Sequence, residues 1–238
     1  MEEFVTMPDG ARLWTTTCGR GPALAVLNGG PGMADYLSPV ASILEDRHTV
    51  YRYEQRGCGR SDRGCLTLKQ FTDDIDALRR HWKHERWTVL GHSWGVDLAL
   101  AYTLAHRENV IALIALSGGR VHDDRSWHAI YSENRHREEQ PPAASPYSAE
   151  VNLALNAEWK AFCRRPTLLA DLAELDVPAL FLFGEHDIWP SWPTEQIAAL
   201  MPRASLQVLS HADHLLWNGN PVGMRNAIFA FLADEPSD

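Results

Sequence analysis

Runs of mainly apolar residues recur along the chain, and each run ends near turn-forming residues. At the start, FVTM and ARLWTTT alternate in character around Pro8-Asp9-Gly10, which predicts a β-hairpin. Six later runs have the composition of strands that are buried on both faces of a parallel sheet. They are 23–28, 48–53, 86–91, 109–119, 178–184 and 204–210.

Helical periodicity separates several of these runs. The apolar residues of 68–82 fall on one face at a spacing of 3.6 residues. Residues 96–108 and 221–233 are also predicted helices, the second with proline in its first turn. This alternation predicts an α/β fold with a mostly parallel, doubly wound sheet, in which functional groups gather at the carboxyl ends of strands.

One region interrupts the alternation of strands and helices. Residues 120–176 contain no convincing strand pattern, and 139–146 are rich in proline. We therefore predict a small, mostly helical cap insertion at 120–170. The core of the protein would then consist of residues 1–119 and 171–238.

Composition and charge exclude several classes of function. The 238 residues are 45% hydrophobic, and 22 Lys and Arg against 31 Asp and Glu give a net charge of −9 without a long basic run, which argues against nucleic-acid binding. No apolar stretch approaches the ~20 residues of a membrane span, and the first residues do not resemble a secretion signal. The four cysteines lack metal-binding spacing. We expect a cytoplasmic protein without a metal or cofactor, acting on a small molecule or short peptide.

A serine between two glycines follows the third of the six runs, in Gly91-His92-Ser93-Trp94-Gly95. A tight turn from strand to helix needs small residues on both sides, which the G-x-S-x-G pattern supplies. Such a turn exposes the serine Oγ beside a helix N-terminus, which favours a developing negative charge. By itself, the pattern favours a serine that only caps a helix.

The two groups that would activate a nucleophilic serine follow in the expected order. Asp187 comes after the run 178–184, and His214 comes after 204–210. These positions predict a Ser93–His214–Asp187 triad. Alternatives remain for both partners, Glu185 for the carboxylate and His211 or His186 for the base. His92 adjoins the serine, but neighbouring side chains point apart in this turn, so a structural role is expected for it.

The loop 28–32, Asn-Gly-Gly-Pro-Gly, follows the first of the six runs. Its glycines would let backbone N–H groups approach a substrate closely, and we assign the oxyanion hole to the N–H groups of Gly30 and Trp94. Glycines that serve the turn alone are the other interpretation. For the substrate pocket we name the loop residue Gly29 and three tryptophans near the predicted site, Trp127, Trp189 and Trp217.

These motifs together resemble the α/β-hydrolase superfamily, and within it the proline iminopeptidase branch. NGGPG, EQRGCGRS and GHSWG stand where that branch carries HGGPG, DQRGxGxS and GxSWG. The resemblance implies Ser93 as nucleophile, with Asp187 and His214 as its partners. Asn28, Glu54 and Asp213 depart from the usual residues of the branch, and Asn28 is expected to brace its loop by hydrogen bonding as the usual histidine does.

The cap insertion is about half as long as in that branch, where it supplies acidic residues that hold a free amino group. Here the acidic residues that could do so are Glu133, Glu138, Glu139, Glu150 and Glu158. No pattern selects one of them. The sequence therefore predicts a serine hydrolase that is either iminopeptidase-like or an esterase, lactonase or thioesterase. A non-catalytic ligand-binding protein on the same fold is the third interpretation.

Overall fold

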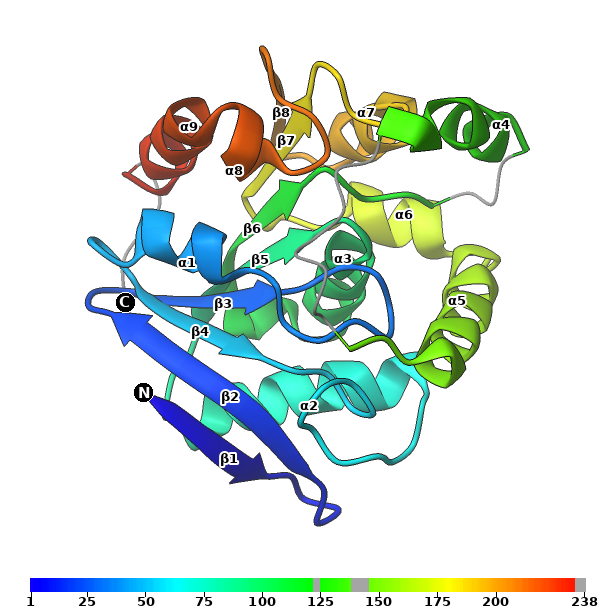
Figure 1. The fold of residues 1–238 in the computed structure, drawn as a ribbon. Helices are drawn as coiled ribbons and strands as arrows, with labels where there is room; N and C mark the ends of the chain where they lie inside the picture. Colours follow the sequence, from blue (N-terminus) through cyan, green and yellow to red (C-terminus); the bar gives the residue numbers. More distant parts are fainter. Residues whose placement is uncertain (122–124, 138–145, 234–238) are drawn as a thin grey trace.

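The structure is a computed structural model, and it describes residues 1–121, 125–137 and 146–233. In these ranges eight strands form one sheet, in the order β1-β2-β4-β3-β5-β6-β7-β8 (Figure 1). β1 and β2 form the predicted hairpin, β2 is antiparallel to β4, and the other neighbours are parallel. The strands are β1 (Glu2–Thr6), β2 (Arg12–Gly19), β3 (Ala23–Leu27), β4 (Thr49–Tyr53), β5 (Trp87–His92), β6 (Val110–Leu116), β7 (Ala179–Gly184) and β8 (Ala204–Leu209).

Helices cover both faces of this sheet. The three helices predicted from periodicity are present as α2, α3 and α9. Those described are α1 (Ser38–Leu44), α2 (Leu68–His81), α3 (Trp94–Ala105), α4 (Arg125–Asn134), α5 (Ala149–Cys163), α6 (Leu168–Ala173), α7 (Trp192–Leu200), α8 (Leu216–Gly219) and α9 (Pro221–Ala233), with short 3-10 turns η1 (Arg107–Asn109) and η2 (Arg135–Arg137). None of the helices in the described ranges is long and apolar enough to cross a membrane.

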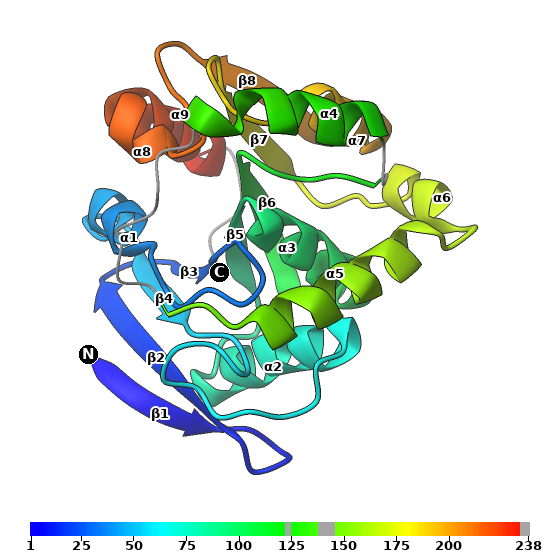
Figure 2. The same cartoon turned by 45° about the vertical axis from the view of Figure 1, so that its right-hand side comes forward.

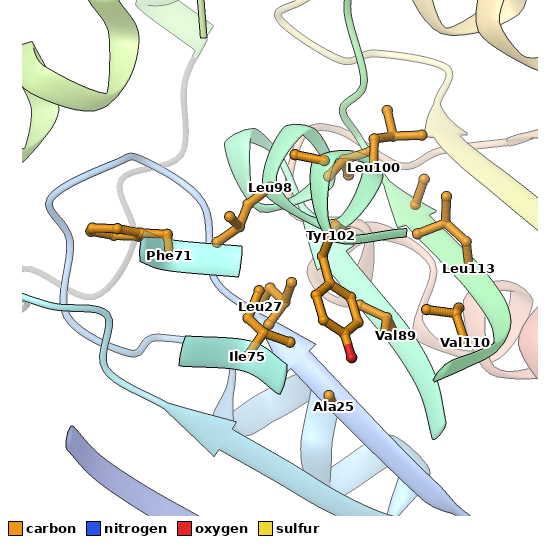
Figure 3. Packing of buried hydrophobic residues seen from close by; sticks show 14 of the residues in the cluster. Ala25, Leu27, Phe71, Ile75, Val89, Leu98, Leu100, Tyr102, Val110 and Leu113 are labelled. Atoms are coloured by element: carbon orange, nitrogen blue, oxygen red, sulfur yellow. The ribbon is translucent and has the colours of Figure 1, made fainter. Parts of the chain in front are cut away.

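Alternate residues of the central strands supply two separate hydrophobic cores, because successive side chains of a strand point to opposite faces. In β3, Ala25 and Leu27 pack with α2 and α3, as Figure 3 shows. Leu24 and Val26 pack on the other face with α1, α8 and α9. Burial on both faces explains why this strand is a continuous apolar run.

The last of the six predicted buried strands is an edge strand, which corrects the sequence interpretation. β8 pairs with β7 on one side and ends the sheet on the other. Three of its six residues are exposed, including Val208, which is 54% exposed. Although the run 204–210 contains apolar residues, β8 is therefore not buried on both faces.

The segment between β6 and β7 is mostly helical where it is described. Its helices α5 and α6 lie on the side toward which β3, β5 and β6 point, at the carboxyl ends of the strands (Figures 1 and 2). Leu155 of α5 and Leu172 of α6 belong to the same hydrophobic core as the sheet and α3. The division into a core and a cap at 120–170 stays a prediction.

Candidate active site

Ser93 lies in a strained turn between β5 and α3. Its backbone angles are φ 55° and ψ −126°, a conformation that residues other than glycine seldom adopt. A Cβ on Gly91 would stand 2.3 Å from the carbonyl oxygen of Gly95, and one on Gly95 would stand 2.2 Å from that of Leu27. The two glycines are therefore required by close backbone packing around the serine.

Asp187 and His214 form a hydrogen-bonded pair at the ends of β7 and β8. His214 Nδ1 lies 3.0 Å from Asp187 Oδ1 and 3.3 Å from Oδ2, and both side chains are largely buried. Asp187 Oδ1 also accepts a hydrogen bond of 2.9 Å from the backbone N–H of Trp189. The carboxylate is thereby fixed so that it orients the imidazole.

The alternative partners contact each other at the surface. Glu185 accepts a hydrogen bond of 3.0 Å from the backbone N–H of His211, and His186 Nε2 lies 3.9 Å from Glu185 Oε2. All three residues are exposed, and their ligand atoms lie within 4.8 Å of one another, so together they could hold a metal ion. The structure thus pairs His214 with Asp187 and leaves Glu185 outside that pair.

A cavity of about 490 Å³ brings the predicted catalytic groups together. Ser93 and His214 both line it, as do Gly30 and Trp94, the two residues assigned to the oxyanion hole. Trp94 is the first residue of α3, where backbone N–H groups have no acceptor within the helix. Gly30 has φ 51°, and a Cβ there would stand 2.5 Å from Met33 Sδ.

The glycine loop packs directly against the serine turn. A Cβ on Gly29 would stand 2.7 Å from the Ser93 Cβ, so only glycine fits there. Asn28 Nδ2 donates a hydrogen bond of 3.0 Å to the carbonyl oxygen of Met33, which braces the loop as its sequence position suggested.

Two of the four predicted pocket residues lie on the cavity wall. Trp127 and Trp189 line the cavity, and their rings stack at 3.9 Å. Gly29 and Trp217 are not part of the lining. Trp217 is buried in the core that contains α8 and α9, and its ring packs edge-on against His92 at 4.8 Å, so these two pocket assignments are corrected.

Tyr131, which sequence reasoning missed, also belongs to this aromatic wall. It stands one turn after Trp127 in α4, and its ring stacks on Trp189 at 3.7 Å. Trp189 in turn follows Asp187 by two residues. The stack therefore connects α4 to the loop that orients His214.

His92 connects the glycine loop to the His214 loop. Burial and the nearby His214 hold the pKa of His92 well below its usual range, so the ring is neutral. Burial raises the pKa of Tyr36, so its hydroxyl keeps its proton. This hydroxyl lies 2.7 Å from His92 Nδ1 and donates a hydrogen bond to it. His92 Nε2 then donates to the carbonyl oxygen of His214 at 3.0 Å, and the Gly29 N–H donates to Tyr36 at 2.9 Å. No motif spacing pointed to Tyr36.

Charged residues occupy the part of the cavity near α5. Arg120 and Lys160 line it, together with the buried carboxylate of Asp97. Asp97 Oδ1 accepts a hydrogen bond of 3.1 Å from the Arg120 N–H, and its Oδ2 lies 3.5 Å from Arg120 Nε. Burial raises the pKa of Asp97 to about 7, although Arg120 opposes the shift.

Three of the acidic residues considered for amine binding are described by the structure, and they lie outside the cavity lining. Glu133 is exposed, Glu150 Oε2 lies 3.8 Å from Arg63, and Glu158 accepts a hydrogen bond from the Leu68 N–H at the start of α2. None of these three lines the cavity. Glu138 and Glu139 lie outside the described residues.

Known proteins are similar in sequence to part of this chain. A putative proline iminopeptidase from Mycoplasma pneumoniae is 37% identical over 116 residues, which cover 46% of this chain and 38% of that protein. The proline iminopeptidase of Heyndrickxia coagulans is 37% identical over 101 residues, 40% of this chain and 35% of that enzyme. These matches support the resemblance to the iminopeptidase branch, but they span less than two fifths of either relative.

Solved structures show the same fold over nearly the whole chain. The proline iminopeptidase of Mycobacterium smegmatis superposes with a TM-score of 0.76 and 18% identity, covering 98% of both chains. An esterase from Exiguobacterium antarcticum gives the same TM-score and identity, over 98% of this chain and 100% of that one. A family model described as alpha/beta hydrolase fold matches residues 22–158, more than half of this chain. The chain therefore belongs to the alpha/beta hydrolase fold family.

Proposed function

We propose that the protein is a serine hydrolase that cleaves a small acyl ester or amide through an acyl-enzyme. One observation carries the proposal: Ser93, in its strained turn, lines the same cavity as His214, whose Nδ1 is hydrogen-bonded to Asp187. This arrangement combines a nucleophile, a base and an orienting carboxylate. The hydrolases among the related proteins and similar folds support the same class of reaction.

The proposed reaction has two halves. His214 Nε2 takes the proton of Ser93 Oγ as the oxygen attacks the substrate carbonyl, and the Gly30 and Trp94 N–H groups hold the oxyanion. The imidazolium then gives its proton to the leaving alkoxide or amine, which departs and leaves an ester on Ser93. Water attacks that ester while His214 accepts its proton. Collapse of the second intermediate releases the acid and returns the proton to Ser93.

Asp187 has a supporting part in both halves. It accepts the Nδ1–H of His214, which keeps Nε2 available as the base and stabilises the imidazolium. The carbonyl of His214 is held by His92, so the backbone beside the base is positioned as well. We assign positioning roles to His92 and Tyr36, since neither lines the cavity.

Within this class we favour an ester or amide whose acyl part carries no free amine. A proline iminopeptidase must bind an ammonium group, for which a carboxylate facing the substrate is the natural partner. Of the described residues that line the cavity, only Asp97 has a carboxylate, and both of its oxygens face Arg120. This observation supports the esterase-type alternative over strict iminopeptidase specificity.

The test compares hydrolysis of 4-nitrophenyl butyrate and L-proline 4-nitroanilide by the wild type, Ser93→Ala and Ser205→Ala. Ser205 is an exposed serine of the edge strand β8 and serves as the matched control. We expect ester hydrolysis by the wild type and the control, and its loss in Ser93→Ala with circular dichroism unchanged. Ester hydrolysis that survives in Ser93→Ala would contradict the proposal, and rapid cleavage of the anilide would restore the iminopeptidase interpretation.

A further inference from the structure

We propose that the substrate's acyl chain ends in a carboxylate, which Arg120 and Lys160 bind at the end of the cavity that α5 covers. The inference rests on the proposed function, because it names the substrate class of the same site. Half-esters and half-amides of small dicarboxylic acids belong to this class. A cavity of about 490 Å³ has the size of known small-molecule sites.

The two cations lie on neighbouring parts of the cavity wall. Asn152, Asn156 and Lys160 follow one another at intervals of four residues in α5 and all line the cavity, so they form one stripe of the helix. Arg120, in the segment after β6, reaches this stripe, since its Nη2 lies 3.4 Å from Asn156 Oδ1. A single anionic group placed near Asn156 would therefore face both positive charges.

Arg120 is held in position before any substrate binds. Its backbone N–H and its Nε face Asp97, and its guanidinium carbon lies 4.4 Å from the centre of the Trp127 ring. The arginine side chain consequently loses little conformational freedom on binding an anion. A guanidinium also matches the planar shape of a carboxylate.

Asp97 is the one carboxylate among the described residues that line the cavity. It faces Arg120 and is 2% exposed, so its oxygens are engaged inside the wall. Because burial raises its pKa to about 7, the carboxyl is partly protonated near neutral pH. In the described lining Arg120 and Lys160 carry positive charge and Asp97 is the one carboxylate, a set of groups that favours an anionic substrate over an ammonium group.

The experiment compares two esters of equal chain length, monomethyl glutarate and methyl pentanoate, by pH-stat titration. The glutarate ester carries a carboxylate where the pentanoate ester carries a methyl group. We expect kcat/KM of the wild type to be at least tenfold higher for the glutarate ester. The ratio of the two kcat/KM values should fall at least tenfold in Lys160→Met and in the double variant Arg120→Gln/Asp97→Asn, which avoids leaving Asp97 buried without its cation.

Lys69→Met is the matched control, because Lys69 is an exposed lysine of α2 that pairs with Asp73. It should leave the ratio unchanged. A wild type that prefers methyl pentanoate, or a ratio that both cavity variants leave unchanged, would overturn the inference. So would faster hydrolysis of methyl 4-(trimethylammonio)butyrate, which places a cation at the same position.

Calorimetric binding to Ser93→Ala separates this inference from the proposed function. The variant cannot form the acyl-enzyme, so the affinity for monomethyl glutarate is measured without turnover. We expect it to exceed the affinity for methyl pentanoate at least tenfold. If the wild type hydrolysed none of the esters but this preference held, the proposed function would fail and the anion site would stand. Equal affinities would overturn the anion site whatever the activity.

Discussion

The hydroxyl of Tyr36 donates a hydrogen bond to Nδ1 of His92 over 2.7 Å, deep behind the candidate nucleophile. On one side Tyr36 accepts the N–H of Gly29, and on the other His92 donates to the carbonyl oxygen of His214. The loop of the predicted oxyanion hole, the strand before Ser93 and the loop of the predicted base are thus joined by side chains that do not touch the cavity.

Removing the Tyr36 hydroxyl tests this connection. Tyr36→Phe leaves His92 Nδ1 and the Gly29 N–H without a partner, and unsatisfied buried groups cost about 1–3 kcal/mol. We expect a loss of unfolding free energy of that size in urea titrations and a drop in kcat of roughly tenfold or more, with KM little changed. Tyr147→Phe, at a tyrosine that is 59% exposed, is the control for both measurements. A kcat that stays at the wild-type value would show that the connection does not position the reacting groups.

The choice between two neighbouring carboxylates gives a second prediction. Asp187→Asn keeps the size of the side chain but disturbs the imidazole orientation, so we expect kcat/KM for a 4-nitrophenyl ester to fall by roughly 10³–10⁴. Glu185→Gln is the matched control and should remain within a few-fold of wild type, because Glu185 accepts its hydrogen bond from His211. A larger loss of kcat/KM in Glu185→Gln than in Asp187→Asn would assign the orienting role to Glu185.

Close packing at the serine turn predicts a large effect on folding. In Gly95→Ala the new Cβ would meet the Leu27 carbonyl oxygen at 2.2 Å, so a backbone segment must move. We expect a loss of several kcal/mol of unfolding free energy, measured by chemical denaturation, or failure to fold.

Gly10→Ala provides the comparison for that loss. Gly10 has φ 92° and nothing within 4 Å of its added Cβ, so only backbone strain applies. That strain should amount to about 1 kcal/mol. Equal losses in the two variants would mean that the space around Gly95 is not limiting.

The buried carboxyl of Asp97 predicts how stability changes with pH. Its pKa rises from 3.8 in the unfolded chain to about 7 in the folded protein, because burial disfavours the charged form. The folded state therefore holds this proton more tightly, and the stability that the protonated group provides is lost as the pH rises through about 7. Between pH 5 and pH 8 this loss should be on the order of 2 kcal/mol.

Asp97→Asn removes the titrating group at this position. Between pH 5 and pH 8 the unfolding free energy should therefore fall less in the variant than in the wild type. Asp73→Asn, which alters an acid of an exposed ion pair on α2, should keep the wild-type dependence. If the pH dependence of Asp97→Asn matched that of wild type, Asp97 would not titrate in this range.

The parts of the fold and site that could be predicted are those marked by a local sequence pattern or by the order of residues along the chain. The β3 run could be recognised because both of its faces are buried, and Ser93 because its flanking glycines are needed within one turn. The order of Asp187 and His214 after late strands predicted the hydrogen-bonded pair, and the contacts in the structure separate it from the alternative Glu185.

Other features depend on tertiary packing that leaves no local pattern. The roles of Tyr36 and Tyr131 arise from contacts with residues more than fifty positions away in the sequence. The edge position of β8 follows from the order of strands in the sheet, which its own composition does not encode. Trp217 could not be assigned to a face of its short helix, and it packs behind the nucleophile instead of lining the cavity.

The most direct test of the central claim is labelling with a fluorophosphonate, followed by peptide mass spectrometry to locate the adduct. The probe bonds covalently to an activated serine. We predict one adduct on Ser93, its absence in Ser93→Ala, and much slower labelling in His214→Gln with Ser205→Ala unaffected. No adduct on the folded wild type, or an adduct on another serine that persists in Ser93→Ala, would contradict the account.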